Sequence, residues 1–260
     1  PTLAEEQRVP HRLYGHINAA ETYSVGRWCG EAGAVLADIG SDGPAIIVGG
    51  TGLYFNALTR GLAKMPPIPA DIRDAVRGRL LSEGVAALYA DLTARDAKAA
   101  ARLQSNDRAR IARALEVVLA TGRSILDWQG NNEPAPVALA AAAKIFLMPE
   151  GDEMARRIDR RFDAMMAAGA LDEVRALAAR KLGQSLPPMK AHGVPWLIRH
   201  LAGDVTLAEA IAHAKLETRQ YTKRQATWFR NQLPEFEWVA PPEAQAAIES
   251  QLRTIDSAQT

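Results

Sequence analysis

Apolar residues recur at helical spacing along most of the chain, and only a few short segments are continuously apolar. In the first clear example, Val25, Trp28 and Ala32 share one face of a predicted helix. Ser24 is placed to cap the start of this helix, and Gly40 is placed to end it. The pattern therefore predicts an amphipathic helix between Ser24 and Gly40.

A short apolar run follows at Ala45–Val48, and its composition suits a strand buried on both faces of a parallel sheet. It leads directly into a glycine-rich turn, Gly49–Gly52, and then into a helical stretch over residues 53–58. Helix, strand, glycine-rich turn and helix in this order predict an α/β sheet. Further strands are predicted at Lys144–Met148 and, at the edge of the sheet, at Trp238-Val239.

The middle of the chain has a different character. Between Asp71 and Thr121 every segment has helical periodicity, and no strand interrupts it. Thr93–Asp96 resembles a capping box, and the last helix of this block is predicted over residues 105–121. Linkers at Met65–Pro69 and Asn131–Pro136 flank the block, which predicts a small helical insertion.

The opening residues 1–23 are polar and are predicted to be irregular, whereas the last third of the chain is mainly helical. Helices are predicted over residues 152–168 and 171–181, and a long one begins at a Thr206 capping box and continues to about Asn231. The predicted domain organisation is an α/β core over residues 1–66, an all-helical insertion over residues 67–136, and the second part of the core over residues 137–260.

Composition limits the class of protein. The chain has 260 residues, of which 48% are hydrophobic and 23% charged, as in an ordinary globular protein. No run of about 18 apolar residues occurs, so we expect no membrane span. The single cysteine, Cys29, excludes an intramolecular disulfide, and with no basic-then-apolar leader at Pro1 it favours a cytoplasmic protein. A formal net charge of +1 does not favour nucleic-acid binding, but a total does not say where the charges lie.

The glycine-rich turn Gly49–Gly52 is the first candidate site. A turn between a strand end and a helix N-terminus presents unpaired N–H groups that suit a phosphate, and Thr51 adds a hydroxyl. A tight turn without a ligand is an equal alternative. The segment is neither a Walker A loop nor a dinucleotide-binding fingerprint, because no Gly-Lys-Ser/Thr or Gly-x-Gly-x-x-Gly pattern is present there.

Two arginine pairs are candidate phosphate-binding groups. Arg110 and Arg113 project from the same face of their predicted helix, and a pair of guanidinium groups can bind phosphate. Arg157 and Arg161 have the same relationship on a helix that follows a predicted strand. The alternative in both cases is an ordinary solvated face, and acids such as Asp159 could neutralise the second pair.

The strongest signal lies on the last long helix. Lys215, Arg219 and Lys223 repeat every four residues and form a basic ridge, which Arg224 and Arg230 extend. Tyr221, Trp228 and Phe229 are interleaved with them, and Glu217 is the one acid set against them. Basic groups beside aromatic rings are what a phosphodiester backbone and an unstacked base require. The alternative is a solvated ridge whose neighbouring aromatic residues belong to the core.

Taken together, these segments resemble the tRNA dimethylallyltransferase (tRNA isopentenyl transferase) family. The resemblance covers most of the chain in matching order, and the last of its motifs is highly specific. The matching stretches are Val9–Leu13, Tyr23–Gly26, Ile47–Tyr54, Asn106–Val117, Arg157–Phe162 and Thr218–Arg230.

The resemblance implies a P-loop-NTPase-like parallel sheet core with an all-helical insertion that grips the anticodon stem-loop of tRNA. Members of the family transfer a dimethylallyl group from dimethylallyl diphosphate to N6 of adenosine 37, which is flipped out of the anticodon loop. Mg²⁺ helps to neutralise the diphosphate leaving group. The resemblance also implies a monomeric protein in the cytoplasm.

The family's functional residues can be carried over to matching positions. Thr51 and Arg161 would be catalytic, and Gly49, Gly50, Arg157 and Arg161 would bind the diphosphate. The tRNA-binding residues implied by the resemblance are Thr51, Arg73, Ala109, Arg110, Ile111, Ala112, Arg113, Lys190, Ala191, His192, Gly193, Val194, Pro195, Arg219, Lys223, Arg224, Gln225, Ala226, Thr227, Trp228, Phe229 and Arg230.

Two departures from the family pattern change what is expected. The family has an Ile-Gly-Tyr-like sequence where this chain has His192-Gly193-Val194, which removes an aromatic residue from a tRNA-facing turn. The family also opens with a strand, a phosphate-binding loop and a general-base aspartate, and Pro1 falls after these segments. We therefore expect no metal ligand in this chain and no prenyl transfer by the 260 residues alone.

Two other functions remain open at this point. The chain could be a catalytically inactive tRNA-binding fragment or module, with tRNA affinity that depends steeply on salt and no diphosphate binding. It could also be a different nucleotide-handling α/β enzyme, such as a small-molecule kinase. The latter leaves the basic helix unexplained.

Overall fold

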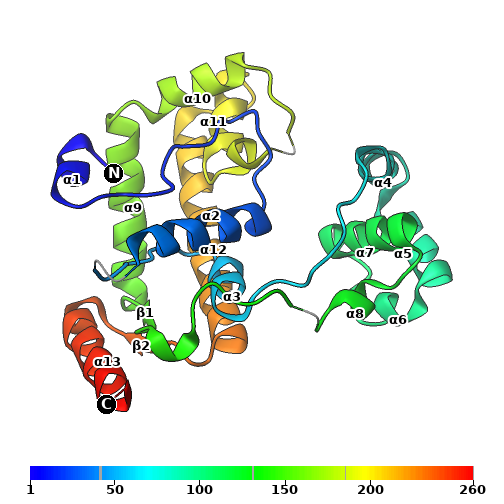
Figure 1. The fold of residues 1–260 in the computed structure, drawn as a ribbon. Helices are drawn as coiled ribbons and strands as arrows, with labels where there is room; N and C mark the ends of the chain where they lie inside the picture. The colour runs from blue at the N-terminus through cyan, green and yellow to red at the C-terminus, as the bar shows by residue number, and fades with distance from the viewer. Residues whose placement is uncertain (41–42, 131, 185, 260) are drawn as a thin grey trace. The chain divides into compact units, whose positions relative to one another are not determined.

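The computed structural model describes residues 1–40, 43–130, 132–184 and 186–259. The chain divides into two compact units, one formed by Pro1–Arg60 with Ala135–Thr260 and the other by Gly61–Pro134 (Figure 1). Each unit has buried apolar clusters of its own. Asn131, with which the second predicted linker begins, lies outside the described residues.

The first unit is mostly helical and contains a small parallel sheet. Its elements are α1 (Leu3–Arg8), α2 (Val25–Ile39), α3 (Gly52–Arg60), η1 (Leu139–Ala141), β1 (Ile145–Leu147), α9 (Gly151–Ala167), α10 (Ala170–Ala179), η2 (Pro187–Lys190), α11 (Val194–Leu201), α12 (Leu207–Gln232), β2 (Glu237–Val239), η3 (Pro241–Glu243) and α13 (Ala244–Gln259). Strands β1 and β2 pair in parallel, with Phe146 opposite Trp238. The α/β class and both of these predicted strands are confirmed. The prediction that residues 1–23 are irregular is wrong for Leu3–Arg8, because a Thr2–Glu5 capping box starts the short helix α1 there.

The strand predicted at Ala45–Val48 is wrong. These residues form no strand, and Ile46 and Val48 are 85% and 75% exposed. An apolar run becomes a buried strand only where neighbouring strands pair with its N–H and C=O groups. In the described part of the chain, the sheet consists of β1 and β2, and neither pairs with this segment.

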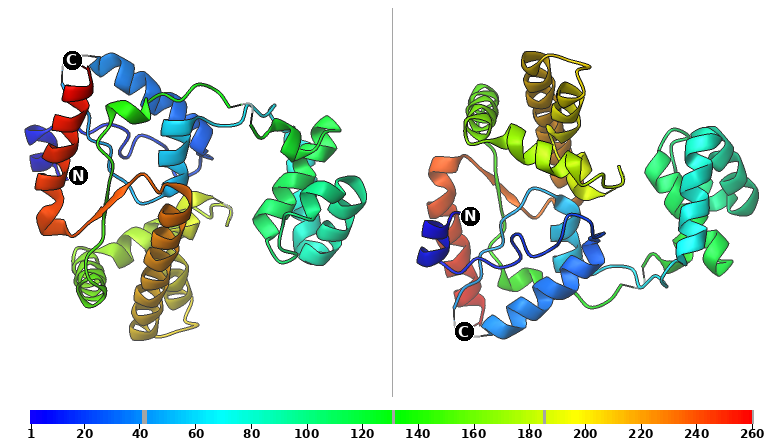
Figure 2. Two further views of the ribbon diagram at one scale, coloured as in Figure 1. Left: turned by 90° about the horizontal axis from the view of Figure 1, so that it is seen from below. Right: turned by 90° about the horizontal axis from the view of Figure 1, so that it is seen from above.

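Helix α12 organises the first unit. Its start has the predicted capping box, in which the Thr206 hydroxyl accepts from the Glu209 N–H and the Glu209 carboxylate accepts from the Thr206 N–H. Along its length α12 packs against α3, α9 and α11 (Figure 2). Near its C-terminal end, Phe229 and Leu233 are almost fully buried in a cluster that includes Phe55 of α3. This cluster fixes the helix that follows the glycine-rich turn against the C-terminal half of α12.

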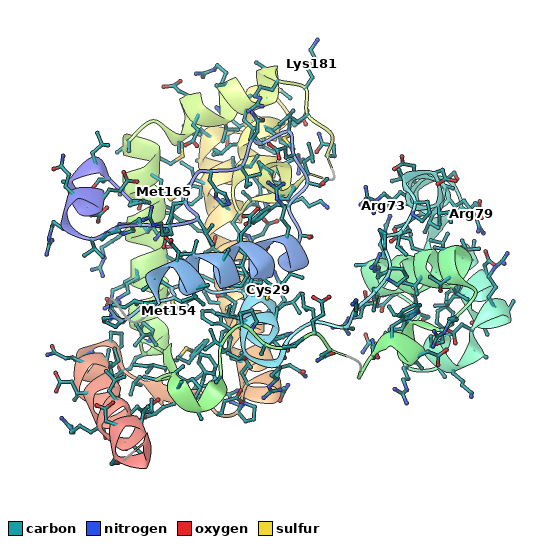
Figure 3. All side chains as sticks on the ribbon, viewed as in Figure 1. Cys29, Arg73, Arg79, Met154, Met165 and Lys181 are labelled. Atoms are coloured by element: carbon teal, nitrogen blue, oxygen red, sulfur yellow. The ribbon has the colours of Figure 1, made fainter. Side chains whose placement is uncertain are left out.

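The single cysteine links the first two long helices. Cys29 is buried, and its Sγ donates a hydrogen bond of 3.5 Å to the carbonyl oxygen of Ala57 in α3 (Figure 3). The residue therefore packs as a small buried side chain between α2 and α3.

The second unit is a helical bundle, as the periodicity predicts. It contains α4 (Ala70–Ser82), α5 (Gly84–Arg95), α6 (Ala97–Ala100), α7 (Arg108–Thr121) and α8 (Ile125–Trp128). Val76, Leu88, Leu92 and Leu115 lie in its core. The capping box predicted at Thr93–Asp96 is wrong, because Thr93 belongs to α5 and Asp96 alone caps the next helix.

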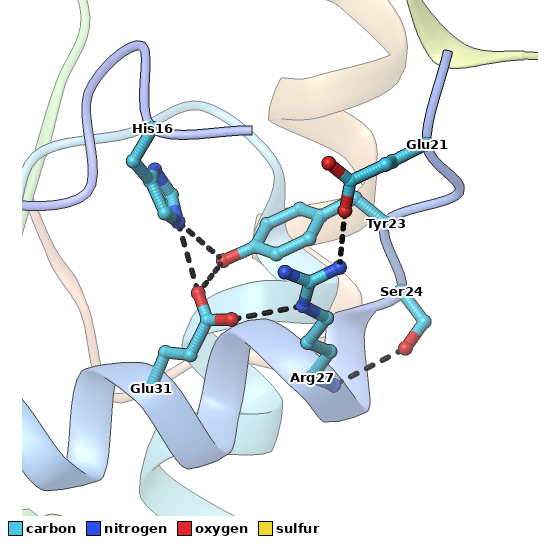
Figure 4. Close-up of polar contacts among 6 residues, drawn as sticks. All are labelled: His16, Glu21, Tyr23, Ser24, Arg27 and Glu31. Atoms are coloured by element: carbon cyan, nitrogen blue, oxygen red, sulfur yellow. Dashed lines mark hydrogen bonds and ion pairs between the residues drawn. The ribbon is translucent and has the colours of Figure 1, made fainter. Parts of the chain in front are cut away.

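A polar cluster holds the opening segment against α2 (Figure 4). The Glu31 carboxylate accepts 2.6 Å and 2.9 Å hydrogen bonds from Tyr23 Oη and Arg27 Nε, and His16 Nε2 lies 2.9 Å from it. The bond from Tyr23, then those from His16 and Arg27, lower the pKa of Glu31 from 4.5 to about 2. Burial and the hydrogen bond to Glu31 raise the pKa of Tyr23.

This cluster predicts a pH-dependent contribution to stability. Since the pKa of Glu31 is lowered by folding, its contribution is complete above its ordinary value of 4.5 and is lost as the pH falls toward about 2. Glu31→Gln should therefore lower the melting temperature at neutral pH, and the difference from the unaltered chain should shrink as the pH falls. Melting curves across this range, with Glu6→Gln as the control, measure the effect. A difference that does not change with pH would contradict the assignment.

Candidate nucleic-acid interface

The glycine-rich turn lies directly against α12. The side-chain amide Nε2 of Gln225 donates a 2.6 Å hydrogen bond to the carbonyl oxygen of Gly50. A Cβ atom at Gly50 would lie 2.4 Å from that nitrogen, and one at Gly52 would lie 2.1 Å from the Trp228 ring. Glycine is required at position 52, where the Trp228 ring leaves no room for a side chain, whereas at position 50 the end of the Gln225 side chain would have to move. Thr51 stays exposed, with its Oγ1 3.5 Å from Tyr221 Oη.

Two hollows flank this contact. One, of about 140 Å³, is bordered by residues 47–51 and by the aromatic side chains of Trp28, Tyr54 and Phe55. The other, of about 360 Å³, lies along α12 and is lined by Lys223, Arg224, Thr227, Trp228, Asn231 and Gln232. Sequence reasoning missed Tyr54 and Phe55, although aromatic residues placed so soon after a glycine-rich turn are a usable signal.

The basic ridge of α12 is only partly free. Lys215 Nζ lies 2.6 Å from Asp163 Oδ1, and Arg219 Nη2 lies 2.5 Å and 2.6 Å from the two Asp159 oxygens. The sequence-based statement that acids do not balance this ridge is therefore wrong for its first half. The two acids lie four residues apart on α9, which matches the spacing of the two basic residues on α12.

The C-terminal half of the basic ridge, from Lys223 to Arg230, keeps its positive charges available to a ligand. Within the described part of the chain, Lys223, Arg224 and Arg230 make no side-chain hydrogen bond or ion pair. The Arg224 and Arg230 guanidinium groups lie 5.8 Å and 4.8 Å from the ring centres of Tyr221 and Trp238. These groups are exposed and can contact an anion without breaking an internal ion pair. Ala226 and Phe229, however, are 7% and 2% exposed, so the structure corrects their predicted place on the tRNA-facing surface.

Among the described residues, the arginines of helix α9 also divide into ones that pair with an acid and one that does not. Arg156, Arg157 and Arg160 all pair with Glu153, and the hydrogen bonds from Arg157 and then Arg156 lower the pKa of that carboxyl to about 2. Arg161 is exposed and makes no hydrogen bond or ion pair among residues that the structure describes. Of the predicted diphosphate-binding pair, Arg161 is therefore the guanidinium that is free.

The predicted turn at residues 190–195, which runs from η2 into α11, contacts both α9 and α12. Gly193 is buried with φ +92°, and a Cβ there would lie 2.9 Å from the Phe162 ring of α9. His192 is exposed, and the centre of its ring lies 4.6 Å from that of Tyr221 in α12. The fold thus brings together three separate sequence motifs: the glycine-rich turn, this turn and the basic helix.

In the second unit, the predicted residues divide between surface and core. Arg110 has 73% of its side chain exposed and pairs with Asp107 at 3.5 Å, and Arg113 pairs with Glu116 at 3.3 Å. Arg73 Nη2 donates a 3.1 Å hydrogen bond to the carbonyl oxygen of Ile68. Ile111 and Ala112 are 0% and 8% exposed and face the helical core, so their side chains do not offer the tRNA contacts that the resemblance implies.

Neither a metal cluster nor a membrane span is found in the described part of the chain. No group of three or more His, Cys, Asp or Glu side chains there is arranged to hold a metal ion. None of the described helices has the length and apolar character needed to cross a bilayer.

Comparison with known proteins gives a consistent result. Residues 1–232 match the family described as IPP transferase. A tRNA dimethylallyltransferase of Rhodopseudomonas palustris is 56% identical over 96% of this chain and 80% of that protein. One from Nitrobacter hamburgensis is 54% identical over 95% of this chain and 78% of that protein. The solved structure of a full-length tRNA isopentenylpyrophosphate transferase from Bacillus halodurans has a TM-score of 0.66 and 30% identity, covering 100% of this chain and 84% of that one.

Proposed function

The chain belongs to the IPP transferase family, and we propose that it transfers a dimethylallyl group from dimethylallyl diphosphate to N6 of adenosine 37 in tRNA. The observation that carries the proposal is the meeting of Thr51, the turn at residues 190–195 and the unpaired basic half of α12. The alternative of an inactive tRNA-binding module receives no support from the relatives, which are named as transferases.

The RNA side of the proposal rests on charge and exposed aromatic rings. Lys223, Arg224 and Arg230 would contact phosphates, since they are exposed and have no carboxylate partner among the described residues. In the helical unit, Arg110 and Arg113 would contact the anticodon stem-loop. The remaining residues of the turn at 190–195 and of α12 stay proposed tRNA contacts, apart from the buried side chains noted above.

The reaction forms a bond between N6 of adenine and C1 of the allyl group. The bond between C1 and the diphosphate oxygen breaks, its electron pair leaves with the diphosphate, and N6 loses one proton to solvent water. We propose that Arg161 binds the departing diphosphate, because its guanidinium is free and can stabilise the growing negative charge. Gly49, Gly50 and Arg157 are further proposed diphosphate contacts, although Arg157 must first leave Glu153.

The acceptor and the allyl group must also be aligned. Thr51 is placed for this, because its exposed hydroxyl lies on the turn between the apolar hollow and Tyr221. The hollow of about 140 Å³ has the aromatic lining that a five-carbon hydrocarbon group favours.

We also propose the type of core, the role of Mg²⁺, the oligomeric state and the cellular compartment. A P-loop-like core is supported by the parallel pairing of β1 with β2 and by the likeness to a solved transferase. Mg²⁺ would shield the diphosphate charge, but the described residues do not fit a site that holds it, so the steps above use only groups of the chain itself. A monomer in the cytoplasm is expected, in keeping with the single buried Cys29.

Incubation of unmodified tRNA with the chain and isotope-labelled dimethylallyl diphosphate tests the proposed activity. We expect label in adenosine after digestion of the tRNA to nucleosides. This replaces the expectation from the sequence alone that the 260 residues transfer no prenyl group, because the relatives that match 95–96% of this chain are named as transferases. If the tRNA carries no label although the same preparation binds tRNA, the result would favour the alternative of an inactive tRNA-binding module.

The basic residues Lys223 and Arg224 of α12, unpaired among the described residues, lead to a second prediction. The double variant Lys223→Ala/Arg224→Ala should weaken tRNA binding. It should also make the negative slope of log affinity against log salt shallower by roughly 1.4 to 1.8, since each phosphate contact contributes about −0.7 to −0.9. Binding titrations at several salt concentrations measure this slope. Arg8→Ala/Arg12→Ala, which removes the same charge elsewhere in the first unit, is the matched control. Equal slopes for the two double variants would contradict a role specific to α12.

A further inference from the structure

His192 differs from the other histidines in how little holds its ring. The sequence has five histidines, and in the structure His11, His16 and His200 each make a hydrogen bond. His213 lies flat on Trp196, with ring centres 3.9 Å apart and planes 6° apart. His192 makes no hydrogen bond or ion pair with any described residue, and its ring contact is with Tyr221. Both of its ring nitrogens are therefore available to a ligand.

The surroundings of His192 narrow the kind of ligand. Tyr221 is partly buried, carries the Arg224 guanidinium 5.8 Å from its ring centre, and has its hydroxyl 3.5 Å from Thr51 Oγ1. The next cation along the helix, Lys223, is exposed and has no carboxylate partner in the described part of the chain. The site thus offers two adjacent rings, a guanidinium group over one of them, and two hydroxyl groups at the edge. These groups suit a ligand with a flat ring that forms hydrogen bonds and is attached to an anionic backbone.

We propose that His192 and Tyr221 form a stacking platform for an unpaired base of the RNA substrate, beside Thr51. This inference rests on the proposed function, and it names where a loop base is held. The exposed imidazole stacks on the base, and Tyr221 supports the imidazole from below. The contact orients the RNA loop, so both residues are positioning residues for the reaction at the neighbouring site.

Three features favour a nucleobase over an apolar ligand. The platform lies outside the apolar hollow, whose lining does not include His192 or Tyr221. The rings meet at 49°, so His192 is not covered by a parallel partner as His213 is. Gly193, next to His192, is buried against Phe162, which fixes the backbone that carries the imidazole. A ring held at a rigid turn loses little entropy on stacking.

An anticodon stem-loop RNA that contains 2-aminopurine at single loop positions tests the platform. Stacking quenches this fluorescent base, so binding to the unaltered chain should quench it at one or two positions. His192→Ala should weaken binding by roughly 5- to 150-fold, the effect of losing about 1–3 kcal/mol of base stacking, and should remove the quenching. His192→Phe, which keeps a ring, should retain the quenching and bind within about threefold of the unaltered chain.

Matched variants separate the possible results. His213→Ala removes a histidine stacked elsewhere on α12 and should leave both readouts unchanged, whereas Tyr221→Leu should resemble His192→Ala. If His192→Ala binds and quenches as the unaltered chain does, or if His192→Phe loses as much as His192→Ala, the platform is wrong while the proposed function stands. Failure of the unaltered chain to bind the stem-loop would overturn the proposed function and the platform together.

Discussion

Replacing Arg161 by alanine should lower the rate of prenyl transfer by roughly 100- to 1,000-fold, the usual cost of losing one donor to the charge that develops in a transition state. Arg161 is exposed on α9 and makes no ion pair with any described residue, whereas its three arginine neighbours share Glu153. The loss should appear mainly in kcat, since the negative charge on the diphosphate grows as the bond to carbon breaks.

Arg160→Ala is the matched control for this experiment. It removes an arginine from the same helix, but one that pairs with Glu153, and it should change the rate by less than about threefold. Arg161→Lys should fall between the two, because an ammonium keeps the charge but not the forked donor geometry. An Arg161→Ala protein that transfers the dimethylallyl group as fast as Arg160→Ala would contradict the assigned role.

Gly52→Ala should have the largest effect on structure. Its added methyl group would lie 2.1 Å from Cε3 and Cζ3 of Trp228, so either the tryptophan ring or the glycine-rich turn must move. Trp228 packs beside the buried cluster of Phe229, Leu233 and Phe236, which leaves the ring little space. Overpacking of this kind costs about 1–3 kcal/mol of unfolding free energy. We also expect weaker tRNA binding, because Trp228 lines the hollow beside Lys223.

Gly30→Ala is the comparison for Gly52→Ala. Gly30 lies in α2, and a Cβ there would meet no atom within 4 Å. Alanine should therefore stabilise the chain by about 0.5–1 kcal/mol through its better helix propensity. Chemical denaturation of the two variants measures both effects. Similar stabilities for Gly52→Ala and the unaltered chain would mean that the turn does not need its glycine.

The helices were largely predictable because their signals are local. The Thr206 capping box, the glycine end of α7 at Gly122 and the apolar stripe of α2 are all readable within a few residues. The apolar run at Ala45–Val48 shows where such local signals are not sufficient. Its sequence is that of a buried strand, but the structure leaves it without a pairing strand among the described residues, and no local pattern carries that information.

The motifs of the site were also predictable, whereas the availability of their charges was not. Lys215 and Arg219 look the same as Lys223 in the sequence, yet Asp163 and Asp159 of α9 pair with the first two only. That pairing depends on how two helices distant in sequence pack together. The contact of His192 with Tyr221 depends in the same way on the turn at Gly193.

We propose that this site presents an unpaired adenine amine to an allyl diphosphate. The most direct measurement compares two anticodon stem-loops that differ only at the acceptor base, one with adenosine and one with inosine, which lacks the N6 amine. After incubation with dimethylallyl diphosphate and the chain, nucleoside mass spectrometry should find one dimethylallyl group on the adenosine and none on the inosine-containing RNA. Equal modification of both RNAs, or of neither, would contradict the account.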